Sequence, residues 1–147
     1  FDGLNFRLLL WRMGGELISE NGKWASGLGG KHYHILLNEK VRDYHLYTGN
    51  GTEEDTGYLD YDMHNQFVDC YVQFGIIGLL LLVAMLGYLV VQGLHYNADI
   101  LLFITLLFAA TFLTESVLET QSGILLFTII ISGEWIQFHQ KGLEGAI

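Results

Sequence analysis

The sequence is poor in residues that form cross-links or bind polyanions. Only one of its 147 residues is cysteine, Cys70, and none is proline. A single cysteine excludes an internal disulfide. Seven Lys and Arg stand against 16 Asp and Glu, which gives a net charge of −9. Because nucleic-acid phosphates require a basic protein face, we expect no nucleic-acid partner.

Charged residues and histidine are also missing from a long internal stretch, residues 75–94. At about 1.5 Å per residue, roughly 20 helical residues span about 30 Å, the thickness of a bilayer's hydrocarbon core. Residues 100–113 and 123–138 form two further apolar runs. The polar part of the chain is too small to cover three helices that are apolar on every side. We therefore predict an all-α membrane protein with about three transmembrane helices within residues 71–140, and a cytoplasmic tail at 141–147.

Residues 1–70 are mixed and polar. Within them, residues 4–20 predict a helix with one apolar face at helical spacing, made by Phe6, Leu9, Leu10, Met13 and Leu17. Such a helix could lie on a membrane surface with Trp11 at the level of the headgroups. A glycine-rich turn follows at 26–30, and residues 35–63 predict an irregular loop with room for a short helix. The chain lacks an initiator Met and a signal-peptide pattern, so we expect the C-terminal part of a longer protein.

His64 and Asn65 lie about three helical turns before the longest apolar run. If residues 64–94 form one helix that crosses a membrane, His64 stands in water just above the membrane surface. A neutral histidine there could remove a proton from a substrate hydroxyl. Alternatively, His64 only caps or anchors the helix. His32 and His34 lack a third ligand at a recognisable spacing, so no metal site is predicted.

Four stretches together resemble one protein superfamily. The sequence has His64-Asn65, nine residues, Gly75, two residues and Gly78, preceded by NFRLLLW and SGLGG and followed by TESVLETQSG. In this order they resemble the O-antigen ligase and Wzy-type polymerase superfamily of bacterial inner membranes. NFRLLLW is similar to the family's helix with an arginine four residues before a tryptophan. SGLGG is similar to its glycine-rich turn, and TESVLETQSG to its outer connection before the last span.

The resemblance implies a multi-spanning glycosyltransferase of the GT-C-like type without a metal or another cofactor. Its members transfer a glycan from an undecaprenyl-diphosphate carrier to an acceptor at the periplasmic face of the inner membrane. The acceptor is lipid A-core, a growing O-antigen or polysaccharide chain, or a protein hydroxyl, and the sequence leaves these three open. This fragment by itself is expected to be inactive. The competing hypothesis is a non-catalytic membrane assembly or transport subunit whose loop binds a partner.

The resemblance also assigns roles and an orientation. His64 and Arg7 are the expected catalytic residues, and Arg12, Asn65, Glu115 and Glu119 are expected to bind substrate. The loop at 31–63 and both glutamates are expected on the periplasmic side, and the turn at 95–99 in the cytoplasm.

Physical chemistry supports two of these roles independently. The guanidinium of Arg7 would hold the diphosphate, whose negative charge grows as the sugar bond breaks. One of Glu115 and Glu119 is expected to pair with an arginine, because an unpaired acid near lipid is costly.

Overall fold

The computed structural model describes residues 3–52 and 55–144, and their side chains up to Gly133 and at Ile136. These residues form helices, and no strand is assigned among them apart from an isolated bridge between Thr52 and Asp55. In chain order the elements are α1 (Gly3–Asn21), α2 (Gly30–Asp43), α3 (Gln66–His95), α4 (Asp99–Phe112), the short 3-10 helix η1 (Val117–Glu119) and α5 (Gln121–Glu144). The predicted all-α class is confirmed.

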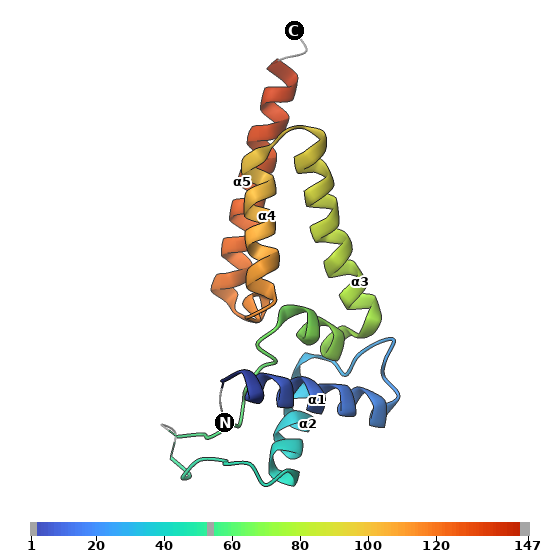
Figure 1. The fold of residues 1–147 in the computed structure, drawn as a ribbon, viewed down its shortest axis with the longest axis vertical. Helices are drawn as coiled ribbons and strands as arrows, with labels where there is room; N and C mark the ends of the chain where they lie inside the picture. The colour runs from blue at the N-terminus through green and yellow to red at the C-terminus, as the bar shows by residue number, and fades with distance from the viewer. Residues whose placement is uncertain (1–2, 53–54, 145–147) are drawn as a thin grey trace.

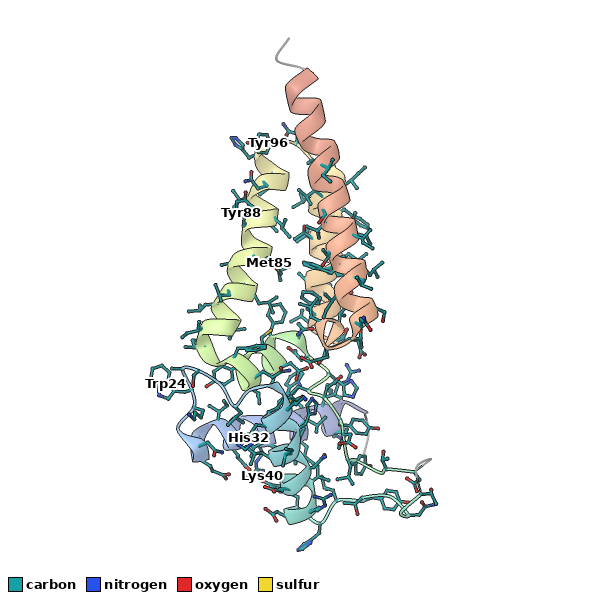
Figure 2. All side chains as sticks on the ribbon, turned by 180° about the vertical axis from the view of Figure 1, so that it is seen from behind. Trp24, His32, Lys40, Met85, Tyr88 and Tyr96 are labelled. Atoms are coloured by element: carbon teal, nitrogen blue, oxygen red, sulfur yellow. The ribbon has the colours of Figure 1, made fainter. Side chains whose placement is uncertain are left out.

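The helices form two parts (Figure 1). α4, α5 and most of α3 run side by side along the long axis of the molecule, and we call residues 76–144 the helical bundle. α1 crosses below one end of this bundle, with α2 below α1. We call residues 3–52 and 55–74 the lower layer. The turn at 95–99 lies at the opposite end of the bundle, as the position of Tyr96 shows in Figure 2.

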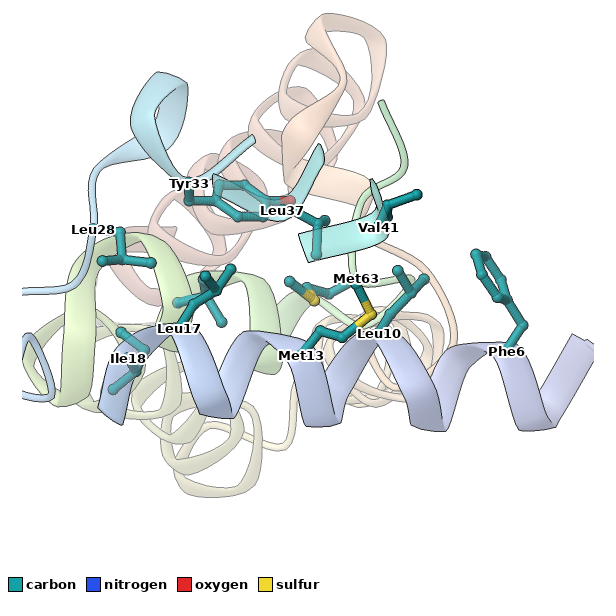
Figure 3. Close-up of a cluster of buried hydrophobic side chains, with 11 residues drawn as sticks. Phe6, Leu10, Met13, Leu17, Ile18, Leu28, Tyr33, Leu37, Val41 and Met63 are labelled. Atoms are coloured by element: carbon teal, nitrogen blue, oxygen red, sulfur yellow. The ribbon is translucent and has the colours of Figure 1, made fainter. Parts of the chain in front are cut away.

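The lower layer has its own hydrophobic core (Figure 3). The buried side chains of α1 recur at the spacing of one helix face and meet the buried face of α2. These residues are Phe6, Leu10, Met13, Leu17 and Ile18 on α1, and Tyr33, Leu37 and Val41 on α2. The apolar face predicted for α1 therefore packs against protein. Trp11, expected at the headgroup level, instead donates its indole N–H to the Met63 carbonyl at 2.7 Å.

α3 is broken at Gly75, where φ is 68° and ψ is −164°. This backbone conformation is essentially restricted to glycine. Residues 66–74 therefore run within the lower layer, and the chain then turns into the bundle (Figure 1). The expectation of one continuous helix over 64–94 is corrected: the helix begins at Gln66 and changes direction after nine residues.

The bundle has a second buried cluster, in which Phe108, Phe112 and Phe127 pack edge-on or tilted. Its outer surface is apolar: Leu81, Phe103 and Ile129 are each about two-thirds exposed. Within the described residues, α3 is the one helix long and apolar enough to cross a membrane. α4 has 14 residues, and the apolar part of α5, Gln121–Gly133, is also shorter than a full span.

Two boundaries differ from the sequence prediction. Residues 35–63 were predicted to be an irregular loop with room for a short helix, but they begin inside α2, a 14-residue helix over Gly30–Asp43. Its buried residues Tyr33, Leu37 and Val41 follow one face. α5 continues to Glu144, so residues 141–144 extend a helix. Residues 145–147 of the predicted tail lie outside the described residues.

Candidate functional site

The segment just before α3 fixes the position of His64. Its backbone lies in the left-handed region, with φ of 46°. The Asp62 Oδ1 atom accepts the His64 backbone N–H at 2.7 Å and lies 3.4 Å from Nδ1 of the same residue. Met63, between them, is fully buried and is tied to α1 through the indole of Trp11. His64 therefore lies in a backbone turn, and the two residues before it, Asp62 and Met63, are both held by hydrogen bonds.

Asn65 joins this turn to the start of α3 and to the α4–α5 connection. Its Oδ1 accepts the N–H groups of Phe67 at 3.0 Å and Val68 at 3.1 Å, the arrangement of a helix N-cap. Its Nδ2 donates to the Leu113 carbonyl at 3.0 Å, and its backbone N–H donates to Ser116 Oγ at 3.2 Å. Asn65 was expected to orient His64 or substrate. It is buried and hydrogen-bonds to the start of α3 and to the α4–α5 connection, so its effect on His64 runs through the backbone.

Arg7, His64 and Glu115 meet although they come from three distant parts of the chain. The guanidinium of Arg7 lies 3.0 Å from Glu115 Oε1, and His64 Nδ1 lies 3.4 Å from Glu115 Oε2. The side chains of Arg7 and His64 are about 30% exposed and that of Glu115 is 52% exposed, so all three remain accessible. The expected pairing of an arginine with one of the two glutamates is therefore present, and the glutamate is Glu115.

A group of aromatic rings packs against the histidine. The ring of Tyr61 packs edge-on against His64, with centroids 5.6 Å apart. Phe6 in turn contacts both Tyr61 and Tyr58, at 5.1 and 4.4 Å. Because Phe6 belongs to α1, one turn of that helix supports the histidine through these rings and presents Arg7 beside it. The predicted loop at 31–63 thus supplies two aromatic residues that the sequence pattern did not single out.

The other two residues expected to bind substrate lie outside this cluster. Arg12 pairs with Glu16 one turn along α1 at 3.0 Å and is 69% exposed. The Glu16 carboxylate also accepts the hydroxyl of Tyr44, whose pKa is raised by this bond. Glu119 accepts a hydrogen bond from the side chain of Gln73. Glu115 and Glu119 therefore do not share one helix face, since Glu115 precedes η1 and Glu119 ends it.

The glycine-rich turn and the break in α3 bind each other through backbone atoms. Leu28 and Gly29 donate their N–H groups to the carbonyls of Val72 and Gln73 at 2.9 and 2.8 Å. The Ile76 N–H donates to the Trp24 carbonyl at 2.9 Å. The break at Gly75 leaves backbone N–H and C=O groups of α3 without a partner inside the helix, and these hydrogen bonds satisfy them. The two glycine motifs that supported the family resemblance are thus neighbours in space.

A buried acid, Asp69, was missed by the sequence analysis. Asp69 is fully buried, and its Oδ1 accepts the Tyr33 hydroxyl at 2.9 Å. Burial raises the pKa of Asp69 to about 6, although the hydroxyls of Ser116 and Tyr33 oppose the rise. The neighbouring charge of Glu119 raises it further. In the sequence, Asp69 could have been noticed only as a single acidic residue in the otherwise uncharged first turns of α3.

Within the described part of the chain, no group of three His, Cys, Asp or Glu side chains could hold a metal ion. Comparison with protein-family models, with curated proteins and with solved structures finds no match to this chain. The chemistry of the site therefore rests on its own geometry.

Proposed function

We propose that this chain belongs to a membrane glycosyltransferase that moves a glycan from an undecaprenyl-diphosphate carrier to an acceptor hydroxyl at the periplasmic face of a bacterial inner membrane. One observation carries the proposal. Arg7, His64 and Glu115 converge at the end of an apolar helical bundle, where a lipid-linked substrate would present its polar headgroup.

A lipid environment for the bundle is supported by its surface. Only 22% of the most apolar 18-residue window of α3 is buried, whereas the core helix of a soluble protein is mostly covered. After Gly75 the helix has the length of a hydrocarbon core, about 30 Å. α4 and α5 lie beside it and are proposed as the second and third spans, although α4 and the apolar part of α5 are each shorter than a hydrocarbon core. In this placement the lower layer lies at the periplasmic surface.

Arg7 supplies the charge that the donor requires. As the bond between sugar C1 and the diphosphate oxygen breaks, negative charge moves to the leaving diphosphate. A guanidinium fork can donate two hydrogen bonds to phosphate oxygens and stays charged at every relevant pH. Glu115 holds Arg7 in place through one carboxylate oxygen. Among the described residues no other hydrogen bond of the guanidinium is found, so its remaining donors can bind phosphate.

His64 supplies the base. The acceptor hydroxyl forms a bond to sugar C1, its proton passes to the neutral imidazole, and the carrier diphosphate leaves. Proton transfer of this kind contributes typically 10²–10⁴-fold to a rate. The acceptor class remains one of three: lipid A-core, a growing glycan or a protein hydroxyl. Deleting the gene and profiling surface glycans by gel separates these three.

The experiment uses the full-length protein in membranes with a carrier-linked glycan donor at saturating concentration, across pH 5 to 9. His64→Gln keeps hydrogen bonding but cannot take the proton, so transfer is expected to fall on the order of 10²-fold or more.

The matched control is His32→Gln, the same change at an exposed histidine of α2. It is expected to transfer glycan at the wild-type rate. Near-wild-type turnover of His64→Gln would overturn the base role. If Arg7→Ala also kept full activity, the Arg7–Glu115 pair would be structural, and the assembly or transport subunit would become the better interpretation.

A further inference from the structure

The ring of His64 is flanked by carboxylates on one nitrogen only. Nδ1 faces Asp62 Oδ1 and Glu115 Oε2, each at 3.4 Å. Among the described residues, no hydrogen bond to Nε2 is found. Ionised carboxylates only accept hydrogen bonds, so they attract a protonated Nδ1. Neutral imidazole carries a single N–H, and its Nε2 is then an unprotonated acceptor.

The two carboxylates differ in how firmly they are held. Glu115 is half exposed and shares its charge with Arg7, which lies 3.0 Å away. A diphosphate bound to Arg7 competes with Glu115 for the same guanidinium. Among the described residues Asp62 pairs with no arginine or lysine: its Oδ1 accepts the His64 backbone N–H and lies 3.4 Å from Nδ1 of the ring. Its hold on the ring therefore persists when a substrate occupies Arg7.

We infer that Asp62 is a positioning residue that keeps the proton on His64 Nδ1 and directs Nε2 at the acceptor hydroxyl. This inference rests on the proposed function of His64. When Nε2 takes the acceptor's proton, the imidazolium carries an N–H on both nitrogens, and the Asp62 carboxylate stabilises its positive charge. Covalent catalysis uses the same arrangement, in which a base activates the nucleophile and a third group orients the base.

The effect of removing one carboxylate depends on the other charged groups around the His64 ring. His64 faces Asp62 on its own segment, Glu115 on the α4–α5 connection and, beyond Glu115, Arg7 on α1. Asp62→Asn removes one negative charge but retains an oxygen that can accept the His64 backbone N–H. Its amide NH₂ beside Nδ1 favours the other tautomer. Turnover is expected to fall on the order of 10²-fold.

The control is Asp60→Asn, the same change two residues earlier. Asp60 bonds to Asn38 and does not contact His64. This variant is expected to keep both the rate of the wild type and its His64 tautomer. A merely structural role for Asp62 would lower the amount of folded protein without changing the His64 tautomer in the fraction that remains.

A measurement independent of turnover separates this inference from the proposed function. In detergent-solubilised protein labelled with ¹⁵N-histidine, His64→Gln identifies the His64 signals. With the imidazole neutral, the wild type is expected to show an unprotonated Nε2 and a protonated Nδ1, and Asp62→Asn is expected to shift the tautomer toward Nε2–H. A wild-type Nε2–H tautomer, or no change in Asp62→Asn, overturns the inference. Loss of the base role with the expected tautomer intact overturns the proposed function alone.

Discussion

Gly27 and Gly75 lie in a backbone contact that leaves no room for a side chain on either residue. A Cβ atom on Gly75 would lie 2.3 Å from the carbonyl carbon of Ala25, and one on Gly27 would lie 2.2 Å from the carbonyl oxygen of Gln73. Both glycines have positive φ, 70° and 68°. The glycine-rich turn therefore fixes the point at which α3 leaves the lower layer, and with it the placement of the bundle relative to His64.

The first prediction concerns this contact. Gly75→Ala is expected to destabilise the protein by on the order of 1–3 kcal/mol, because a strained φ and a clash with rigid backbone are added. Gly87→Ala is the control, since a Cβ there meets nothing within 4 Å and Ala is the better helix residue. Thermal unfolding in detergent should show a lower midpoint for Gly75→Ala only. Equal midpoints for the two variants would mean that the contact adjusts freely.

The second prediction separates the two arginines of α1. Arg7→Lys keeps the charge but loses the fork, so transfer is expected to fall about tenfold, the effect of losing one charge-assisted hydrogen bond of roughly 1.5 kcal/mol. Arg12→Lys is expected to be milder, because Arg12 pairs with Glu16 away from the site. Thermal midpoints should change little in both, since exposed ion pairs contribute about 0–1 kcal/mol. Equal losses of turnover would remove the distinction.

The third prediction uses the buried carboxyl of Asp69. Its pKa in the folded protein, about 6, lies above its ordinary value of 3.8, so the folded state binds the proton more tightly than the unfolded state. The free energy of unfolding therefore falls as pH rises from about 4 to about 6, by on the order of 3 kcal/mol, and the loss persists above that range. Burial is the main cause, opposed by the Ser116 and Tyr33 hydroxyls.

Asp69→Asn should remove this pH dependence. The measurement is the difference in thermal midpoint between wild type and variant at pH 4, 5, 6 and 7, because other carboxylates cancel in that difference. We expect the variant to gain relative to the wild type as pH rises. Parallel curves across the whole range would show that Asp69 titrates in the fold at its ordinary pKa.

The fourth prediction tests the orientation of the bundle. Tyr47 belongs to the lower layer and Tyr96 to the turn at the far end of α3, and both are about half exposed. A cysteine at 47 in a Cys70→Ser background is expected to react with an impermeant maleimide in intact cells, and a cysteine at 96 is expected to react only after the cells are opened. Labelling at 96 but not at 47 would reverse the orientation.

The sequence alone determined the all-helical class and α1, because the 3.6-residue spacing of apolar side chains is a local property of the chain. It also located the long apolar helix and the residues Arg7, His64 and Glu115. The glycine motifs in the sequence included both Gly27 and Gly75, but they did not predict that these two residues contact each other.

Only the tertiary structure decided which polar residues share a site. Arg7 and Glu115 are 108 positions apart, and periodicity carries no information on contacts of that range. The structure also separated Arg12 and Glu119 from the cluster, assigned Asn65 to capping α3, and added Asp62 and Asp69. Each of these outcomes depends on how the break at Gly75 places the helical bundle relative to the lower layer. That placement is set by contacts between distant backbone segments, and no local sequence pattern encodes such contacts.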